Sequence, residues 1–248
     1  MIELKDIDVI FNKGTNLENH VLKLLNLKVK KGDFVTVIGG NGAGKSTLMN
    51  VLAGDVLPNS GKIMIDKEDV AYKTTENRAI DVARVFQDPM LGTCAELTIE
   101  ENLALAYKRG QVRGLKLSLN DNLREHFKQV LAELKIGLED RLKDKVALLS
   151  GGQRQILSLV MATLRPCKIL LLDEHTAALD PKMSELVLEL TNKLYANNKL
   201  TILMITHNIK HAFMYGNRTI MMQDGVVTLD LKGEDRSSFD LLSILSVY

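Results

Sequence analysis

The sequence contains no tryptophan, and cysteine, proline and aromatic residues are scarce. Its 248 residues include two cysteines and four prolines, and aromatic residues make up 4% of the chain. Cys94 and Cys167 lie far apart, without a second pair or a histidine-rich neighbourhood. This spacing favours reduced, structural thiols of a cytosolic protein and argues against a disulfide or a cysteine metal site.

Long hydrophobic runs and a surplus of one charge sign are also absent. The 32 Lys and Arg residues nearly balance the 31 Asp and Glu residues, which argues against a nucleic-acid-binding role. No apolar run reaches the roughly 18 residues that a membrane-spanning helix needs, and Met1–Asp6 does not have the pattern of a signal peptide. We therefore expect one domain that does not itself cross a bilayer, and docking on a protein that does so stays open.

A glycine-rich stretch, residues 39–47, has the spacing of a phosphate-binding loop, with four residues between the first glycine and Gly-Lys-Ser. It follows an apolar run at Phe34–Ile38, which predicts a buried strand, and precedes a helical pattern at Leu48–Ala53. Glycines let the backbone approach a polyphosphate closely, and the N–H groups at a helix start face the anion. Lys45 would supply a charge for the outer phosphates and Ser46 a hydroxyl for Mg²⁺.

The alternative, a glycine-rich turn with a chance lysine, is disfavoured by the strand before the stretch and the helix after it. The predicted ATP-binding residues of the stretch are Gly39, Asn41, Gly42, Ala43, Gly44, Lys45, Ser46 and Thr47.

Two adjacent carboxylates follow a second apolar run. Ile169–Leu172 predicts a buried strand that delivers Asp173 beside the phosphate loop, where it can hold Mg²⁺. Because side chains alternate along a strand, Glu174 points elsewhere and could orient or deprotonate an attacking water. An Asp-Glu pair is usually surface charge, but the apolar run and the upstream loop favour a catalytic pair.

A second glycine motif lies at Leu149–Arg154. Ser150 is a good N-cap for a helix over 153–164, and two glycines follow it. This predicts either an ordinary capped helix or a second anion-binding helix terminus.

The rest of the chain indicates an α/β fold. Strand patterns at 2–10 and 21–29 indicate an antiparallel pair, and residues 71–82 have no clear pattern. Residues 98–164 are mainly helical, with a capping box at Thr98–Glu101 and a helical period over 118–135. Further strands are expected at 62–66, 84–87, 168–173, 200–206, 218–223 and 226–230, and further helices at 181–197, from 208, and at 239–245 as an amphipathic tail.

Four motifs in this order resemble the ATP-binding subunit of an ABC transporter: Gly39–Ser46, Leu149–Gln153, Leu172–Glu174 and Thr206–His207. The resemblance covers essentially the whole chain. It implies a P-loop NTPase (ABC ATPase) core at 1–88 and 166–248 with an antiparallel β subdomain, and an inserted helical signature subdomain at 89–165. It also implies hydrolysis of ATP with Mg²⁺.

The resemblance also assigns roles within the site. Gln87 matches the glutamine loop that senses metal and water, and His207 matches the switch histidine beside the γ-phosphate and the catalytic carboxylate. Phe11 sits where the family has an aromatic that stacks on adenine, although it could equally belong to the core. The implied catalytic residues are Glu174, His207 and Gln87, and the implied metal ligands are Ser46, Gln87 and Asp173.

Further matches imply a head-to-tail dimer. Asp180 matches the D-loop, which crosses the dimer seam in the family. Ser150, Gly151, Gly152 and Gln153 would bind the nucleotide held by the opposite subunit, so that two sites form only when two copies pair.

His175 departs from the family, which commonly has proline after the catalytic glutamate. Loss of proline frees φ and restores an N–H donor, which would alter D-loop mobility, and a direct chemical role for His175 is the less favoured interpretation. The run Asp173–Asp180 resembles a bacterial subgroup that pairs with a permease and a lipoprotein-type binding protein. That subgroup is linked to uptake of aromatic amino acids, tryptophan among them.

These patterns predict an ATPase that powers import of a small solute by dimer closure, at the cytoplasmic side of the cell membrane, without a nucleic-acid partner. Residues 89–97 are the expected contact for the permease, although Met90, Leu91 and Leu97 could instead be core. Alternatives are an exporter or lipoprotein-releasing ATPase, a soluble ABC-type protein acting on ribosomes or DNA, and a non-hydrolysing regulatory module.

Overall fold

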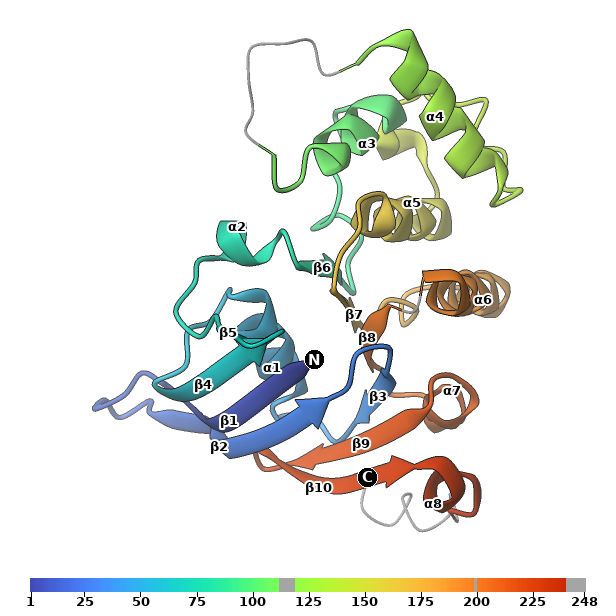
Figure 1. Ribbon diagram of the computed structural model, residues 1–248. Helices are drawn as coiled ribbons and strands as arrows, with labels where there is room; N and C mark the ends of the chain where they lie inside the picture. The colour runs from blue at the N-terminus through green and yellow to red at the C-terminus, as the bar shows by residue number, and fades with distance from the viewer. Residues whose placement is uncertain (112–118, 199, 240–248) are drawn as a thin grey trace.

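A six-stranded sheet runs through the centre of the molecule (Figure 1). The structure is a computed structural model and describes residues 1–111, 119–198 and 200–239. The strand order is β10-β9-β3-β8-β7-β6, parallel except for the antiparallel pair of β9 and β10. The strands are β3 (Phe34–Ile38), β6 (Val82–Val85), β7 (Ile169–Asp173), β8 (Thr201–Ile205), β9 (Arg218–Gln223) and β10 (Val226–Lys232).

A second, antiparallel sheet covers one face of the first, and helix α1 (Lys45–Ala53) lies between them. Its order is β2-β1-β4-β5, with strands β1 (Ile2–Phe11), β2 (Asn19–Val29), β4 (Ser60–Ile65) and β5 (Glu68–Asp69). Buried side chains of both sheets and of α1, such as Ile7, Val37 and Leu48, form one core. Each has 1% of its surface exposed or less, so this layer provides much of the apolar burial that stabilises the fold.

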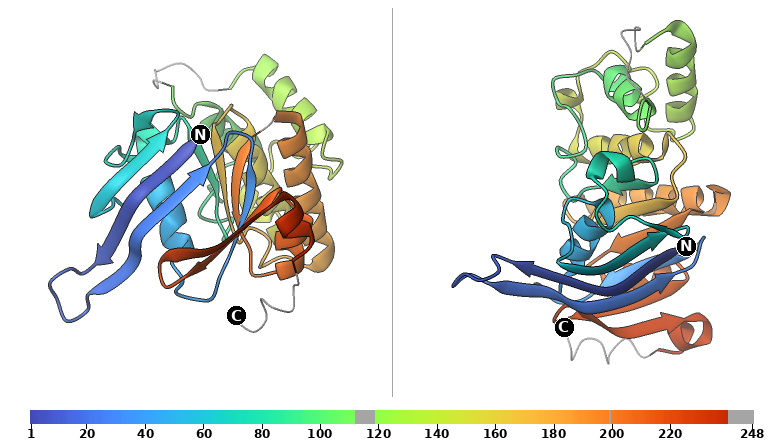
Figure 2. Two further views of the ribbon diagram at one scale, coloured as in Figure 1. Left: turned by 60° about the horizontal axis from the view of Figure 1, so that its bottom comes forward. Right: turned by 60° about the vertical axis from the view of Figure 1, so that its left-hand side comes forward.

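Helix α5 (Gly151–Thr163) connects the opposite face of the central sheet to a group of helices. Its Ile156 and Leu159 pack with β7 and with α6 (Pro181–Asn198). Leu157 and Val160, on the other side of α5, pack with α3 (Ile99–Tyr107) and α4 (Asp121–Ala132). Figure 2 shows α3 and α4 beyond α5, on the far side from the antiparallel sheet.

The α/β class with an antiparallel sheet and added helices is confirmed. The capping box at Thr98 is present, because its hydroxyl accepts from the Glu101 N–H while the Glu101 carboxylate accepts from the Thr98 N–H. Asn120 caps α4, so this helix begins at Asp121 and is shorter than the predicted 118–135. Helix α7 (Ile209–Met214) begins after its cap Asn208, as expected.

Two short helices were missed. Helix α2 (Thr75–Arg78) lies in the stretch without a clear pattern, and buried Arg78 holds it by donating to the carbonyls of Val51, Leu52 and Ala71. Burial lowers the pKa of Arg78. Helix α8 (Gly233–Ser237) follows β10. Residues 240–245 of the predicted tail helix lie outside the described residues.

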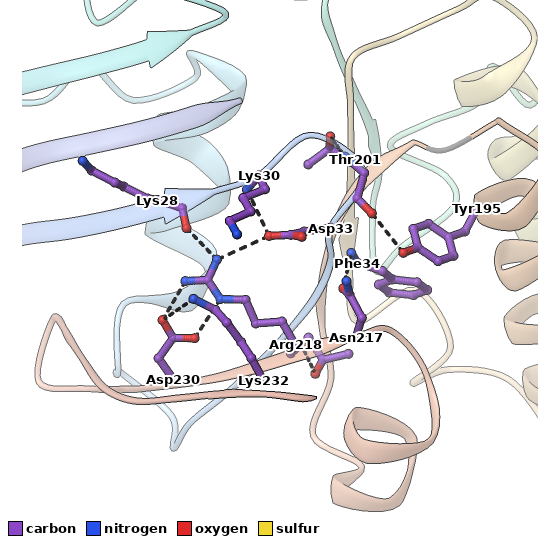
Figure 3. A network of polar contacts seen from close by, with 12 residues as sticks. Lys28, Lys30, Asp33, Phe34, Tyr195, Thr201, Asn217, Arg218, Asp230 and Lys232 are labelled. Atoms are coloured by element: carbon purple, nitrogen blue, oxygen red, sulfur yellow. Dashed lines mark hydrogen bonds and ion pairs between the residues drawn. The ribbon is translucent and has the colours of Figure 1, made fainter. Parts of the chain in front are cut away.

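Buried Arg218 joins the two sheets at their shared edge (Figure 3). Its guanidinium donates to both carboxylate oxygens of Asp230 at 2.7 Å and to the carbonyl of Lys28 on β2 at 2.5 Å. Nearby, the Phe34 N–H donates to the Asn217 side chain at 2.8 Å, and the Tyr195 hydroxyl donates to the Gly32 carbonyl at 2.9 Å. These bonds fix the start of β3, so its other end, which leads into residues 39–47, has a defined position.

Candidate active site

The loop after β3 leaves no room for larger residues at two of its glycines. A Cβ at Gly39, where φ is +148°, would lie 2.2 Å from the Met222 carbonyl oxygen, and one at Gly44 would lie 2.9 Å from the Leu22 side chain. Gly44 is also the N-cap of α1, and no side chain caps this helix. The first N–H groups of α1 are therefore available to an anion, with the positive end of the helix dipole behind them.

Lys45 is held inside this loop. Its ammonium group donates to the carbonyls of Gly39 and Gly40, at 2.7 and 2.9 Å, and the residue is 5% exposed. Burial lowers the pKa of Lys45, and the carboxylates of Glu174 and Asp173 oppose this shift. The side chain thus lies folded over the loop, within the field of both carboxylates.

A cavity of about 560 Å³ lies over the loop. It is lined by residues 41–47, by Glu174, by Phe11 at the end of β1, by Asn19, His20, Val21 and Lys23 of β2, and by Asp224. Phe11 is 37% exposed, so it is not a core residue, and Asn19 is its partner in the β1–β2 register. An open cavity bounded by an aromatic ring at one side and an uncapped helix start suits a nucleoside polyphosphate.

Glu174 and His207 meet at the ends of neighbouring strands. β7 ends at Asp173, and Glu174 takes a left-handed conformation with φ of 45°. Its carboxylate oxygen Oε1 lies 2.6 Å from Nε2 of His207, which follows β8. The expected divergence of the two carboxylates is present, because Glu174 lines the cavity whereas Asp173 pairs with Arg84 at 2.7 Å.

The predicted metal ligands are only partly brought together. Ser46, in the first turn of α1, is exposed to the cavity, and Asp173 interacts electrostatically with the neighbouring Lys45. Gln87 is exposed two residues after β6 and is not among the described residues that line the cavity. Within the described ranges no group of three or more His, Cys, Asp or Glu could hold a metal. This donor set fits Mg²⁺, which is usually bound by one or two carboxylates together with substrate phosphates.

The motif at 150–153 begins α5, and its residues are not among those that line this cavity. The Ser150 hydroxyl accepts from the Gln153 N–H at 3.2 Å, and the Gln153 side chain accepts from the Ser150 N–H. Ser150 and Gly151 are exposed, and an added Cβ at Gly151 would meet no atom within 4 Å. Neither residue lines the cavity, so an anion at this helix start would be a second one. Exposed Asp180 caps α6 by accepting from the Met183 N–H.

His175 is in the core and not in the cavity. It is 2% exposed, and its Nε2 lies 3.5 Å from the Thr191 hydroxyl. Burial, and secondarily the charge of His211, lower the pKa of His175 to about 4. The imidazole is therefore neutral near pH 7, and its position disfavours the direct chemical role considered for it.

Sequence patterns missed two contributions to the site. The β2 residues that line the cavity carried no motif, and only their pairing with β1 could have indicated them. For Arg84 the sequence indicates only a place in the expected strand at 84–87. Its ion pair with Asp173 depends on the parallel pairing of β6 with β7, which no local pattern reports.

The fold and the loop define a nucleotide-binding protein of the P-loop class. A family model described as ABC transporter matches residues 22–177. The chain is 42% identical to a tyrosine transport ATP-binding protein of Clostridioides difficile (strain R20291), over 100% of this chain and 98% of that protein. It is 36% identical to the thiamine import ATP-binding protein ThiQ of Yersinia pestis, over 88% and 87% of the two chains.

A solved dimer of an ATP-binding cassette in a post-hydrolysis state with ADP and phosphate is also similar. The TM-score is 0.80 and the sequence identity is 30%. The match covers 94% of this chain and 98% of that chain. The chain belongs to the ABC transporter family. It is the ATP-binding subunit of an ABC transporter and an ATPase that uses Mg²⁺. ATP-binding domains of this family dimerise and associate with membrane permeases.

No helix in the described part of the chain is long and apolar enough to span a membrane.

A substitution at Gly39 tests the close approach in the loop. Gly39→Ala should lower the free energy of unfolding by about 1–3 kcal/mol, because its Cβ would overlap the Met222 carbonyl. Urea denaturation measures this change. Gly40→Ala is the matched control, since a Cβ there would meet no atom within 4 Å, and its stability should stay within about 0.5 kcal/mol of the wild type. Equal stability of the two variants would contradict the crowding at Gly39.

His175 should make the protein less stable in acid. Since folding lowers the pKa of His175 from 6.5 to about 4, the unfolded chain binds a proton that the folded chain excludes. Between pH 7 and pH 5 this difference should remove about 2 kcal/mol of stability. Urea denaturation of His175→Gln should show a correspondingly weaker pH dependence, whereas exposed His126→Gln should behave as wild type. If His175→Gln keeps the pH dependence of the wild type, His175 is not the cause of the lower stability in acid.

Proposed function

We propose that ATP is hydrolysed in the cavity over the phosphate loop, with Glu174 as the general base. The observation that supports this most directly is the 2.6 Å contact between Glu174 and His207, beside the cavity that also holds Lys45. Lys45 and the loop N–H groups would hold the phosphates. Glu174 would take a proton from the attacking water, and His207 would orient Glu174 and face the γ-phosphate.

We further propose Ser46, Gln87 and Asp173 as the ligands of Mg²⁺, which when bound neutralises phosphate charge. Ser46 follows Lys45 in α1, and Asp173, at the end of β7, interacts electrostatically with Lys45. Gln87 is exposed and so is available to join them. Phe11, with its ring at the edge of the cavity, is the proposed stacking partner of adenine.

A head-to-tail dimer would give the exposed start of α5 a role in binding ATP. The exposed residues 150–151 at the beginning of α5 would bind the ATP of the opposite subunit, with Gly152, Gln153 and the D-loop residue Asp180 nearby in the seam. ATP bound between two such surfaces favours the closed dimer, because a ligand shifts an equilibrium only through differential affinity. In this proposal the core (1–88 and 166–248) and the helical subdomain (89–165) supply opposite sides of each site.

A groove of about 310 Å³ between the core and the helices is the proposed contact for the permease. Its lining includes Phe86, Leu91 and Met161. Leu91 is 70% exposed and Met90 46%, so these two are not core residues, whereas Leu97 is half-buried. An exposed leucine beside an apolar groove fits a surface that a helix of another chain covers.

The proposed direction is import, and the proposed substrate is an aromatic amino acid such as tyrosine or tryptophan. Support comes from the 42% identity to a protein named for tyrosine transport and from the residues 173–180. The proposal includes an extracytoplasmic binding lipoprotein, and it places this subunit at the cytoplasmic side of the membrane through its permease.

Replacing the proposed base tests the catalytic assignment. Glu174→Gln keeps the size of the side chain but cannot accept the proton, so turnover should fall about 10²- to 10⁴-fold while ATP still binds. Phosphate release and gel filtration with ATP measure turnover and the closed dimer. Glu189→Gln, on an exposed position of α6, should behave as wild type. Near-normal turnover of Glu174→Gln would remove Glu174 as the base.

Affinity purification from native membranes tests the groove and the direction of transport. The tagged wild-type subunit should recover a multi-span permease and a binding lipoprotein, identified by mass spectrometry. Leu91→Glu should lose both, because the exposed leucine would no longer bury apolar surface on docking and the new charge would have to be desolvated. Leu17→Glu, at the exposed β1–β2 connection, should retain both. A permease without a binding protein would indicate export, and retention of the permease by Leu91→Glu would refute docking at this groove.

A further inference from the structure

Arg84 pairs with the buried carboxylate that ends β7. It lies on β6, opposite Leu171 in the parallel register. Its Nη2 donates to Oδ2 of Asp173 at 2.7 Å, and the two side chains are 12% and 13% exposed. A carboxylate at the end of a fully buried strand needs such a partner, because an unpaired charge there is costly.

The same guanidinium also contacts residues at and just after the end of α1. Its Nη1 donates to the Asn50 side chain at 2.7 Å and to Oδ2 of Asp55 at 2.9 Å. The Phe86 ring lies against it, 4.6 Å from ring centroid to guanidinium carbon. Three polar contacts and one aromatic contact leave this planar group little freedom to rotate.

These contacts join the two elements that carry proposed metal ligands. α1 begins with Lys45 and Ser46, and Arg84 holds it near its other end, through Asn50. β7 ends at Asp173, which Arg84 holds directly. One side chain outside the cavity over the loop thus contacts both elements, in addition to the strand pairing that sets their overall positions.

Arg84 also affects the electrostatic interaction between Asp173 and Lys45. Asp173 also attracts Lys45 electrostatically, and Lys45 is the charge proposed for the outer phosphates. With Arg84 in place, part of the Asp173 charge is already balanced at Oδ2. Without Arg84, the carboxylate would lose its hydrogen-bonded partner at Oδ2 and be free to turn toward Lys45.

We propose that Arg84 is a positioning residue that sets Asp173 relative to α1 for binding of the metal in the metal–ATP complex. The inference rests on the proposed function, in which Asp173 and Ser46 are metal ligands. Hydrogen-bonded partners of metal ligands typically contribute 10- to 100-fold to metal affinity. The expected effect of removing Arg84 is of that size and is specific to the metal.

The test uses Mn²⁺ as the probe, with the full chain and a non-hydrolysable ATP analogue. Electron paramagnetic resonance titration measures Mn²⁺ affinity, and equilibrium binding in EDTA measures metal-free affinity for the analogue. Arg84→Met should weaken Mn²⁺ at least tenfold and change metal-free binding less than twofold. Arg109→Met is the matched control, since Arg109 donates to the carbonyls of Ala162 and Arg165, and it should retain wild-type Mn²⁺ affinity.

Asp173→Asn separates this inference from the proposed function. If Asp173→Asn leaves Mn²⁺ affinity unchanged, the metal assignment of the proposed function is wrong. If Asp173→Asn weakens Mn²⁺ but Arg84→Met does not, only the positioning role of Arg84 is refuted. An equal loss of Mn²⁺ and metal-free analogue binding in Arg84→Met would also refute it, because it would indicate general disruption.

Asp55→Asn provides a second variant if Arg84→Met does not fold. It removes one charge that Arg84 contacts at the end of α1, on a side chain that is 38% exposed, and it leaves the pair with Asp173. Mn²⁺ affinity should then fall, but by less than the tenfold expected for loss of Arg84. Wild-type Mn²⁺ affinity in Asp55→Asn would refute a contribution of the Arg84–Asp55 pair to the position of Arg84.

Discussion

Parallel pairing of β3, β8 and β7 is the constraint on which the site depends. Val37 and Asp173 both stand opposite Ile205 in this register, so the three strands end at one level. The phosphate loop, Glu174 and His207 follow these ends directly and meet there. Since backbone hydrogen bonds set the register, a one-residue slip of β8 would separate His207 from Glu174. The sheet thus brings the residues of the proposed site together.

Helix α5 connects the central sheet to the exposed helix start at Ser150, which is the proposed site for the ATP of the opposite subunit. One side of it packs on the central sheet through Ile156 and Leu159, and the other side packs on α3 and α4 through Leu157 and Val160. Its capped start, at Ser150, is therefore held rigidly but faces solvent. A helix buried on two sides with an exposed terminus suits an anion site that another copy of the chain completes.

Charge compensation around the buried carboxylates connects the site to the groove. Arg84 balances Asp173 and, with Asp55 and Phe86, also lines the groove proposed for the permease. One guanidinium thus contacts both Asp173, at the end of β7, and two residues of the groove, Asp55 and Phe86. Lys45 stays within the field of both carboxylates, so the loss of either partner would alter the charge that the phosphates meet.

The sequence by itself determined the local parts of this protein. The loop at 39–47, the strand before Asp173 and the capped start of α5 each have patterns within about ten residues, because turns, caps and apolar periods are local interactions. Tertiary structure alone decided the contacts that join distant segments. The Arg84–Asp173 pair, the β2 side of the cavity and the helix held by buried Arg78 depend on strand order and packing. The Glu174–His207 contact was implied by the family resemblance and not by any local pattern. Such contacts join residues that are tens of positions apart, and no local pattern specifies which strands become neighbours.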